Sequence, residues 1–157
     1  MFKTKIRTAV AILAAAAAVM TVGLSAAPAN AAIGPMTAKL TVTPYKPGYH
    51  NVAVFGLVKM SQGEAQSLLN SGHRIVMRLW GEDVFYDDLL IGPYSPQFGP
   101  AATAQGLEFH RVMIGVNDNV LDEDPEGADE LYVGARLVRP GGSTIKSVTT
   151  NRVTGRF

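Results

Sequence analysis

The alternation of apolar and polar residues predicts a protein built from short strands. Residues 74–80 give the clearest pattern, because the large apolar side chains there share one face: Ile75, Met77 and Leu79. Six further segments are rich in β-branched, aromatic or alternating residues: 37–43, 51–60, 89–92, 107–116, 131–139 and 144–153. Turns that contain Pro and Gly, such as Pro47-Gly48 and 140–143, separate several of them. This spacing predicts an all-β fold, an antiparallel β-sandwich of about seven to eight strands, with a small closed barrel as the alternative.

One segment has the pattern of a short helix. Ser61-Gln-Gly-Glu64 has the spacing of a capping box, in which the Ser hydroxyl and the Glu carboxylate each accept from a backbone amide. Ala65, Leu68 and Leu69 follow on one face, and Gly72 is placed to end the helix in a left-handed conformation.

Two of the predicted strands have unusual apolar patterns. Residues 51–60 are apolar on both faces, as expected for a strand in the centre of a sandwich. In residues 107–116 the apolar face changes within the strand, from odd to even positions: Leu107 and Phe109, then Val112, Ile114 and Val116. This change predicts a β-bulge near His110-Arg111 that restores the register.

The N-terminal residues have the three parts of a secretory signal peptide. Lys3, Lys5 and Arg7 precede an apolar run over residues 9–24, and Ala29-Asn30-Ala31 is a small-x-small cleavage signal. A membrane anchor is the alternative, but a span needs about 20 strongly apolar residues. We therefore expect residues 1–31 to be a cleaved signal peptide and residues 32–157 to form one β-sandwich domain. The expected location is extracellular or periplasmic.

Charge and cysteine content narrow the function. Three of the 14 basic residues lie in the predicted signal peptide, so the mature chain would carry 11 basic and 13 acidic residues. Nucleic-acid-binding proteins usually have a basic stripe and a high pI, so this class is not expected. The chain contains no Cys, which excludes disulfides and thiolate metal sites.

The acidic residues are concentrated in two short segments. Four lie in residues 82–88 and seven in residues 118–130. Each segment follows a predicted strand, and an up-and-down strand order would bring both to the same end of the sandwich. Carboxylates that converge in this way repel one another unless a cation, a basic partner or water screens them.

Calcium is the cation that such loops suit, because it takes six to eight oxygen ligands. Residues 122–127 resemble the first half of an EF-hand loop, with acids at positions one, three and five and Gly at six. Val133 at position twelve and Pro125 within the loop argue against a complete EF-hand. We predict a calcium site formed by carboxylates of both segments: Asp83, Asp87, Asp88, Asp122, Asp124 and Glu126. In the alternative interpretation the acids are solvated, and Phe85 and Tyr86 form an exposed aromatic tip.

The stretch from Leu79 to Gly92 resembles the calcium-binding loop of C2 domains. In that family an apolar-aromatic strand end is followed by Asp-x-Asp, a spacer, another Asp and an apolar exit that ends in Gly. The resemblance implies a β-sandwich whose acidic loops bind calcium and often dock on phospholipid. Asp83 would match the second acid of the pair, and Asp87 or Asp88 the later one, whereas Gly81 replaces the first acid.

The sequence gives little indication of an enzyme. Gly-x-Ser-x-Gly, His-Glu-x-x-His and Walker-type motifs are absent, and the three His residues lie in different predicted strands or turns. A small glycan-acting enzyme that uses Asp83 with Asp88 or Asp122 is the third possibility. We therefore expect a non-enzymatic exported domain that binds calcium. The alternative is a metal-independent interaction or envelope-associated protein, with a surface, protein or glycan partner.

Overall fold

All strands pair in antiparallel fashion in the computed structural model, which describes residues 33–83, 86–122 and 127–157. The predicted signal peptide lies outside the described residues. The strands are β1 (Met36–Lys46), β2 (Tyr49–Lys59), β3 (Arg74–Gly81), β4 (Asp88–Tyr94), β5 (Ala101–Thr103), β6 (Gly106–Asn117), β7 (Asp129–Val138), β8 (Thr144–Thr149) and β9 (Val153–Gly155). The helices are α1 (Gln62–Asn70) and α2 (Asp118–Leu121).

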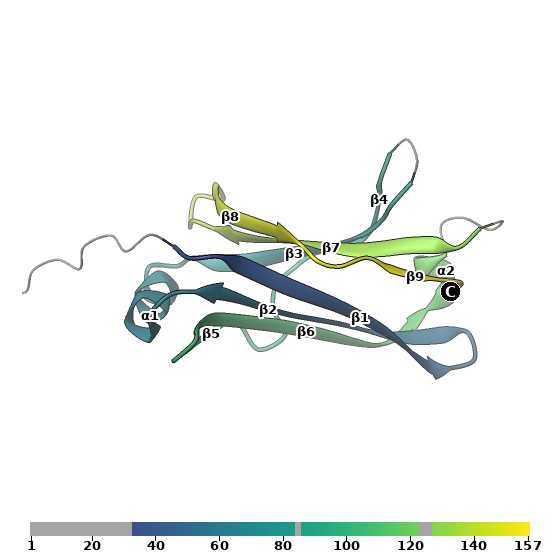
Figure 1. The fold of residues 1–157 in the computed structure, drawn as a ribbon, viewed down its shortest axis with the longest axis horizontal. Coiled ribbons are helices and arrows are strands. Elements are labelled where there is room, and N and C mark those ends of the chain that lie inside the picture. Colours follow the sequence, from purple (N-terminus) through teal and green to yellow (C-terminus); the bar gives the residue numbers. More distant parts are fainter. Residues whose placement is uncertain (1–32, 84–85, 123–126) are drawn as a thin grey trace, which may run out of the picture.

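The strands form two sheets that face each other, which confirms the predicted sandwich. Sheet A has the order β1-β2-β6-β5, and sheet B has the order β4-β3-β7-β8, with β9 also paired to β7. In Figure 1 sheet A forms the lower layer and sheet B the upper one. Helix α1 lies at the end of the sandwich where β3 begins, and α2 lies at the opposite end.

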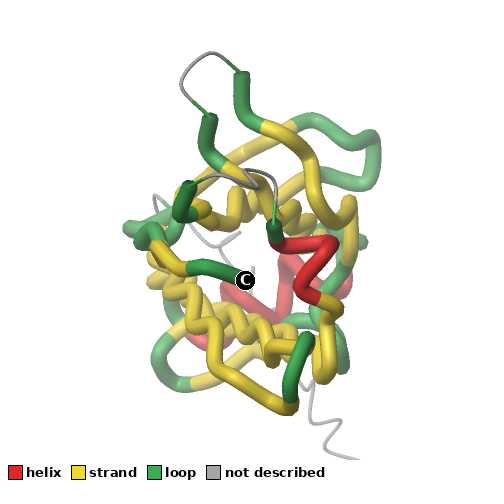
Figure 2. The backbone as a smooth tube through the Cα atoms, turned by 90° about the vertical axis from the view of Figure 1, so that its right-hand side faces the viewer, coloured by secondary structure: helices red, strands yellow, loops and turns green. Residues whose placement is uncertain are grey.

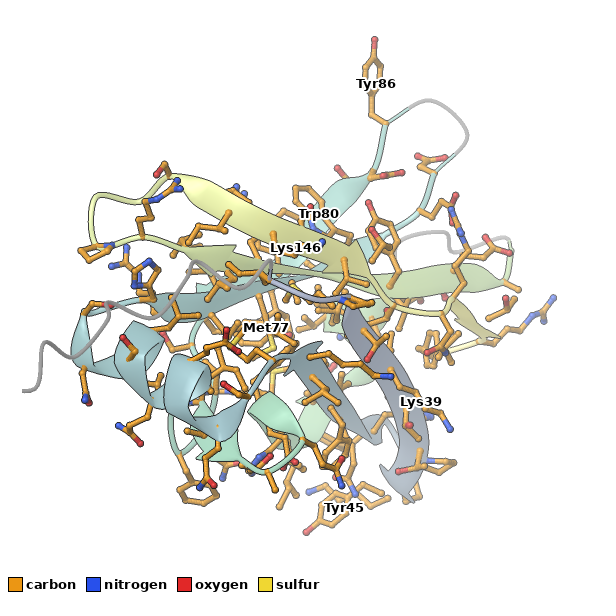
Figure 3. The ribbon with its side chains drawn as sticks, turned by 60° about the vertical axis from the view of Figure 1, so that its left-hand side comes forward. Lys39, Tyr45, Met77, Trp80, Tyr86 and Lys146 are labelled. Atoms are coloured by element: carbon orange, nitrogen blue, oxygen red, sulfur yellow. The ribbon has the colours of Figure 1, made fainter. Side chains whose placement is uncertain are left out.

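The core lies between the sheets and follows the alternation of the sequence. Ile75, Met77 and Leu79 of β3 are fully buried, as predicted, and Figure 3 shows Met77 between the two layers. From sheet A, Phe109 is buried over Gly56, where an added Cβ would lie only 2.1 Å from the phenyl ring. Gly56 therefore provides the space that the largest buried side chain of the core requires.

Helix α1 has the predicted caps at both ends. The Ser61 hydroxyl accepts from the Glu64 amide, and the Glu64 carboxylate accepts from the Ser61 amide. At the other end Gly72 has a φ of +80°, and the amides of Gly72 and His73 donate to the carbonyls of Leu69 and Leu68. This pair of bonds is a Schellman motif. Within the described ranges, neither helix has the length and apolarity needed to cross a membrane.

The predicted β-bulge is present but lies further along β6. His110 and Arg111 pair regularly with Phe55 and Val54, so the prediction at these residues was wrong. The register shifts instead opposite Asn51, at Ile114-Gly115. Gly115 has a φ of +68°, and its amide donates to the Asn51 side chain at 3.2 Å. Glycine tolerates this backbone conformation at no steric cost, which explains the position of the bulge.

Other differences concern short elements. Strand β5 lies between the predicted strands 89–92 and 107–116, where the sequence pattern predicted no element, and α2 is an additional helical turn. The predicted last strand, residues 144–153, is divided into β8 and β9, which both pair with β7. Thr150 separates them, because its buried hydroxyl accepts from the Val133 amide at 2.9 Å and donates to the Asn151 carbonyl at 2.8 Å.

Candidate functional site

The start of the first acidic segment lies beside the end of the second. Gly81 at the end of β3 pairs with Leu131 of β7, and the Glu82 amide donates to the Glu130 carbonyl at 2.8 Å. Figure 2 looks onto this end of the sandwich, and Figure 1 shows β4 projecting from the body there. We call this region the acidic end.

Several carboxylates at or near the acidic end already have partners within the protein. Glu82 is paired with Arg152, whose Nη2 lies 2.6 Å from Oε1 and whose Nε contacts Oε2. The Tyr132 hydroxyl donates to Asp87 at 2.5 Å. These neutral or cationic partners reduce the repulsion between the segments without a bound ion.

The six predicted calcium ligands are placed only in part. Asp83, Asp87, Asp88 and Asp122 are exposed, whereas Asp124 and Glu126 lie outside the described residues. Asp88 begins β4, and Asp122 follows α2, where its amide donates to Asp118. Among the described residues no three His, Asp or Glu side chains are close enough to share a metal ion.

The acidic end also carries an exposed aromatic side chain. Tyr86 is 84% exposed and points away from the body of the protein in Figure 3. Near the base of α2, His50 Nδ1 lies 2.7 Å from Asp118 Oδ1, and the His50 ring contacts the edge of Phe157 at 5.3 Å. The His50 ring is therefore held by contacts within the protein, with Asp118 and Phe157.

A second candidate site lies on the outer face of sheet A. Phe55 of β2 pairs directly with His110 of β6, and their rings are stacked with centroids 5.9 Å apart. Phe98 lies against the other side of His110, at 5.7 Å. We call Phe55, His110 and Phe98 the aromatic row. Phe55 is 53% exposed and Phe98 80% exposed, so both rings are accessible to solvent.

The loop before β5 positions Phe98 beside His110. The Gln97 amide donates to the His110 carbonyl at 3.1 Å, and the Gln97 side chain accepts from the Val112 amide at 3.3 Å. These bonds attach the loop to the free edge of β6. Phe98 is therefore held next to the sheet although its own side chain is exposed.

Two members of the aromatic row, Phe55 and His110, border an open trough of about 400 Å³, and Phe98 lies beside it against His110. Lys39 of β1 lies opposite Phe55 across the strand pair, and Glu108 and Gln105 line the trough near the start of β6. The Glu108 carboxylate accepts from the Thr103 hydroxyl at 2.8 Å, which fixes its orientation. The trough thus combines aromatic faces, one cation, one carboxylate and an amide.

Sequence reasoning did not identify this trough. Phe55 was assigned to a strand buried on both faces, and His110 to a bulge. The strand pairing could have indicated it, because regular antiparallel pairing of the three strands places Lys39, Phe55 and His110 side by side on one face.

Comparisons with models of protein families, with curated proteins and with solved structures found no match.

Proposed function

We propose that this chain is an exported, non-enzymatic glycan-binding module that functions without a bound metal ion. The observation that carries the proposal is the aromatic row beside a polar trough on the outer face of sheet A. Export is inferred from the signal peptide pattern of residues 1–31.

The chemistry of the trough suits a sugar. A pyranose ring has an apolar face of C–H groups, which packs on an aromatic ring, and a rim of hydroxyl groups that need hydrogen-bond partners. Phe55 and Phe98 offer exposed rings, and their two χ angles mean that little conformational entropy is lost on binding. Lys39 and Glu108 supply a donor and an acceptor for the hydroxyls.

The shape also favours an extended ligand. The trough is open to solvent, and the row runs across strands β2 and β6 to the loop before β5. An open, shallow surface of this kind fits a segment of a polysaccharide better than a small molecule, which usually occupies an enclosed pocket.

Affinity electrophoresis of the purified protein in gels containing neutral, cationic or anionic polysaccharides tests the proposal. At least one class should retard the wild type. Phe98→Ala should weaken binding about 5- to 150-fold, because a lost ring contact of about 1–3 kcal/mol corresponds to this range. Phe98 is 80% exposed, so the substitution should leave the fold intact.

Tyr86→Ala is the matched control, because it removes an equally exposed ring from the acidic end. It should bind as the wild type does. The proposal fails if no polysaccharide class retards the wild type, or if Phe98→Ala and Tyr86→Ala reduce retardation equally.

Calcium binding at the acidic end is the second candidate function. It is favoured by the bond between Glu82 and Glu130, which joins the start of the first acidic segment to the end of the second. Thermal denaturation with calcium, with magnesium and with a chelator distinguishes the two. A rise in the melting temperature specific to calcium would support this candidate, and an unchanged melting temperature would refute it.

A further inference from the structure

Three arginines gather on the outer face of sheet B. Arg74 and Arg78 lie on β3 and are separated by Val76, which pairs directly with Arg136 of β7. Arg136 is therefore the diagonal neighbour of both, and such neighbours lie about 7–8 Å apart in an antiparallel sheet. Arginine side chains are long enough to bring all three guanidinium groups over Val76.

The three side chains border a shallow hollow of about 360 Å³. Val76 and Val138 contribute apolar surface to it, and Pro93 and Ser95 border it on the side of β4. We call Arg74, Arg78, Arg136 and this hollow the arginine site.

None of the three arginines forms an ion pair or hydrogen bond with another described residue. Two other arginines have side-chain partners: Arg152 is paired with Glu82, and Arg139 donates to the Ser143 hydroxyl at 3.3 Å. The Nε of Arg78 is buried without a described partner, as is the Nε of Arg111 outside the site. A buried donor of this kind is costly unless a ligand or water satisfies it.

Glu82 follows β3 and lies four residues beyond Arg78 and eight beyond Arg74, roughly 13 Å and 26 Å along an extended chain. Its carboxylate is already paired with Arg152. Charges separated by more than about 8–10 Å are largely screened at physiological ionic strength. Among the described residues no carboxylate pairs with the three guanidinium groups, so the like charges of the site repel one another.

We propose that the arginine site binds a phosphate group. Guanidinium groups donate paired hydrogen bonds in a planar fork that matches phosphate oxygens, and arginine is weakly hydrated compared with lysine. Three forks around a hollow can contact a tetrahedral anion from several sides, and the bound charge removes the repulsion. This site lies on the opposite layer from the aromatic row, so the proposal is independent of glycan binding there.

Calorimetric titration of the purified protein with inorganic phosphate at constant ionic strength, with chloride as the reference anion, tests the proposal. The wild type should bind phosphate saturably, and its melting temperature should rise with phosphate. Arg136→Gln should bind about tenfold more weakly or worse, equivalent to about 1.4 kcal/mol. Arg156→Gln removes the same charge from an exposed C-terminal residue and should bind as the wild type does.

The melting temperature in phosphate-free buffer shows whether Arg136 acts in phosphate binding or in supporting the fold. Arg136→Gln should melt within about 2 °C of the wild type or above it in phosphate-free buffer, because one of three repelling charges is removed. A markedly lower melting temperature would show that Arg136 supports the fold, and it would overturn the proposal.

Vesicles identify the source of the phosphate group. Binding to phosphatidylglycerol vesicles but not to phosphatidylcholine vesicles, lost in Arg136→Gln, would assign a lipid headgroup. Binding of inorganic phosphate without vesicle binding would assign a soluble phosphorylated ligand. The proposal is overturned if neither probe binds, or if Arg136→Gln and Arg156→Gln weaken binding equally.

Discussion

Replacing Asn151 by Ala is expected to weaken the attachment between the two sheets. Asn151 follows β8 in sheet B, yet its side chain accepts from the Leu40 amide at 2.9 Å and donates to the Leu40 carbonyl at 3.1 Å. Leu40 lies on β1, the edge strand of sheet A. A third bond joins the Asn151 side chain to the Arg152 carbonyl at 3.2 Å. One side chain thus replaces a strand partner for β1 and joins segments 111 residues apart.

The magnitude follows from these three bonds. Each contributes a net of about 1 kcal/mol, and Leu40 is only 1% exposed, so water cannot fully replace the lost partner. We expect Asn151→Ala to lower the free energy of unfolding by about 2–3 kcal/mol. For a domain of this size about 1 kcal/mol corresponds to roughly 4 °C, so the melting temperature should fall by about 10 °C.

Circular dichroism during thermal denaturation measures the effect. Asn119→Ala is the matched control, because the exposed side chain of Asn119 forms no hydrogen bond with a described residue. Asn151→Asp keeps the acceptor for the Leu40 amide but loses the donor to its carbonyl, so it should also destabilise the protein. A fall of less than about 3 °C for Asn151→Ala would refute the reasoning, because it would be worth under about 1 kcal/mol.

Two further predictions concern the core and its edge. Gly56→Ala should destabilise the protein by about 1–3 kcal/mol, because the new Cβ would lie 2.1 Å from the Phe109 ring. The control is Gly63→Ala in α1. Its new Cβ meets no atom within 4 Å, so it should stabilise the protein by up to about 1 kcal/mol. Equal effects in chemical denaturation would contradict this contrast. The Tyr94 hydroxyl is buried without a described partner, so Tyr94→Phe should raise stability by about 1 kcal/mol. Burial also raises the pKa of Tyr94 to about 12, although the charge of Arg111 opposes this shift. As the pH rises, Tyr94 therefore ionises in the unfolded state before it ionises in the folded state, and the free energy of unfolding should fall between about pH 10 and 12. This loss should be smaller in Tyr94→Phe, and an identical alkaline profile would contradict it.

The local features of the fold could be predicted because short segments of sequence determine them. The alternation in β3 and the capping box of α1 each depend on residues within one element, and both predictions are confirmed. The position of the bulge depends on a backbone conformation instead. Gly115 was the relevant signal, because a glycine within a strand often marks a bulge, whereas the apolar pattern alone pointed to His110-Arg111.

Features that depend on distant partners could not be predicted from the local pattern. Residues 144–153 are uniformly suited to a strand, and only the contacts of Thr150 with Val133 divide them. Likewise, strand order correctly placed the two acidic segments at one end. It could not show that Arg152 and Tyr132 would be the partners of Glu82 and Asp87. The Arg152 cation and the Tyr132 hydroxyl lie 70 and 45 residues along the chain from the carboxylates that they contact.

The pattern of β2 connects the sequence most directly with the proposed function. An apolar strand in the centre of a sheet is usually covered on both faces, but an antiparallel sheet can leave one face in water. Phe55 lies on that outer face and remains 53% exposed, and its cross-strand neighbours are Lys39 and His110. Smaller or more polar residues would satisfy the solvent better at this position. The cross-strand stack of Phe55 on His110 contributes only about 0.2–1 kcal/mol to stability. If the ring also contacts a glycan, as we propose, Phe55→Ala should reduce the free energy of glycan binding by more than it reduces the free energy of unfolding.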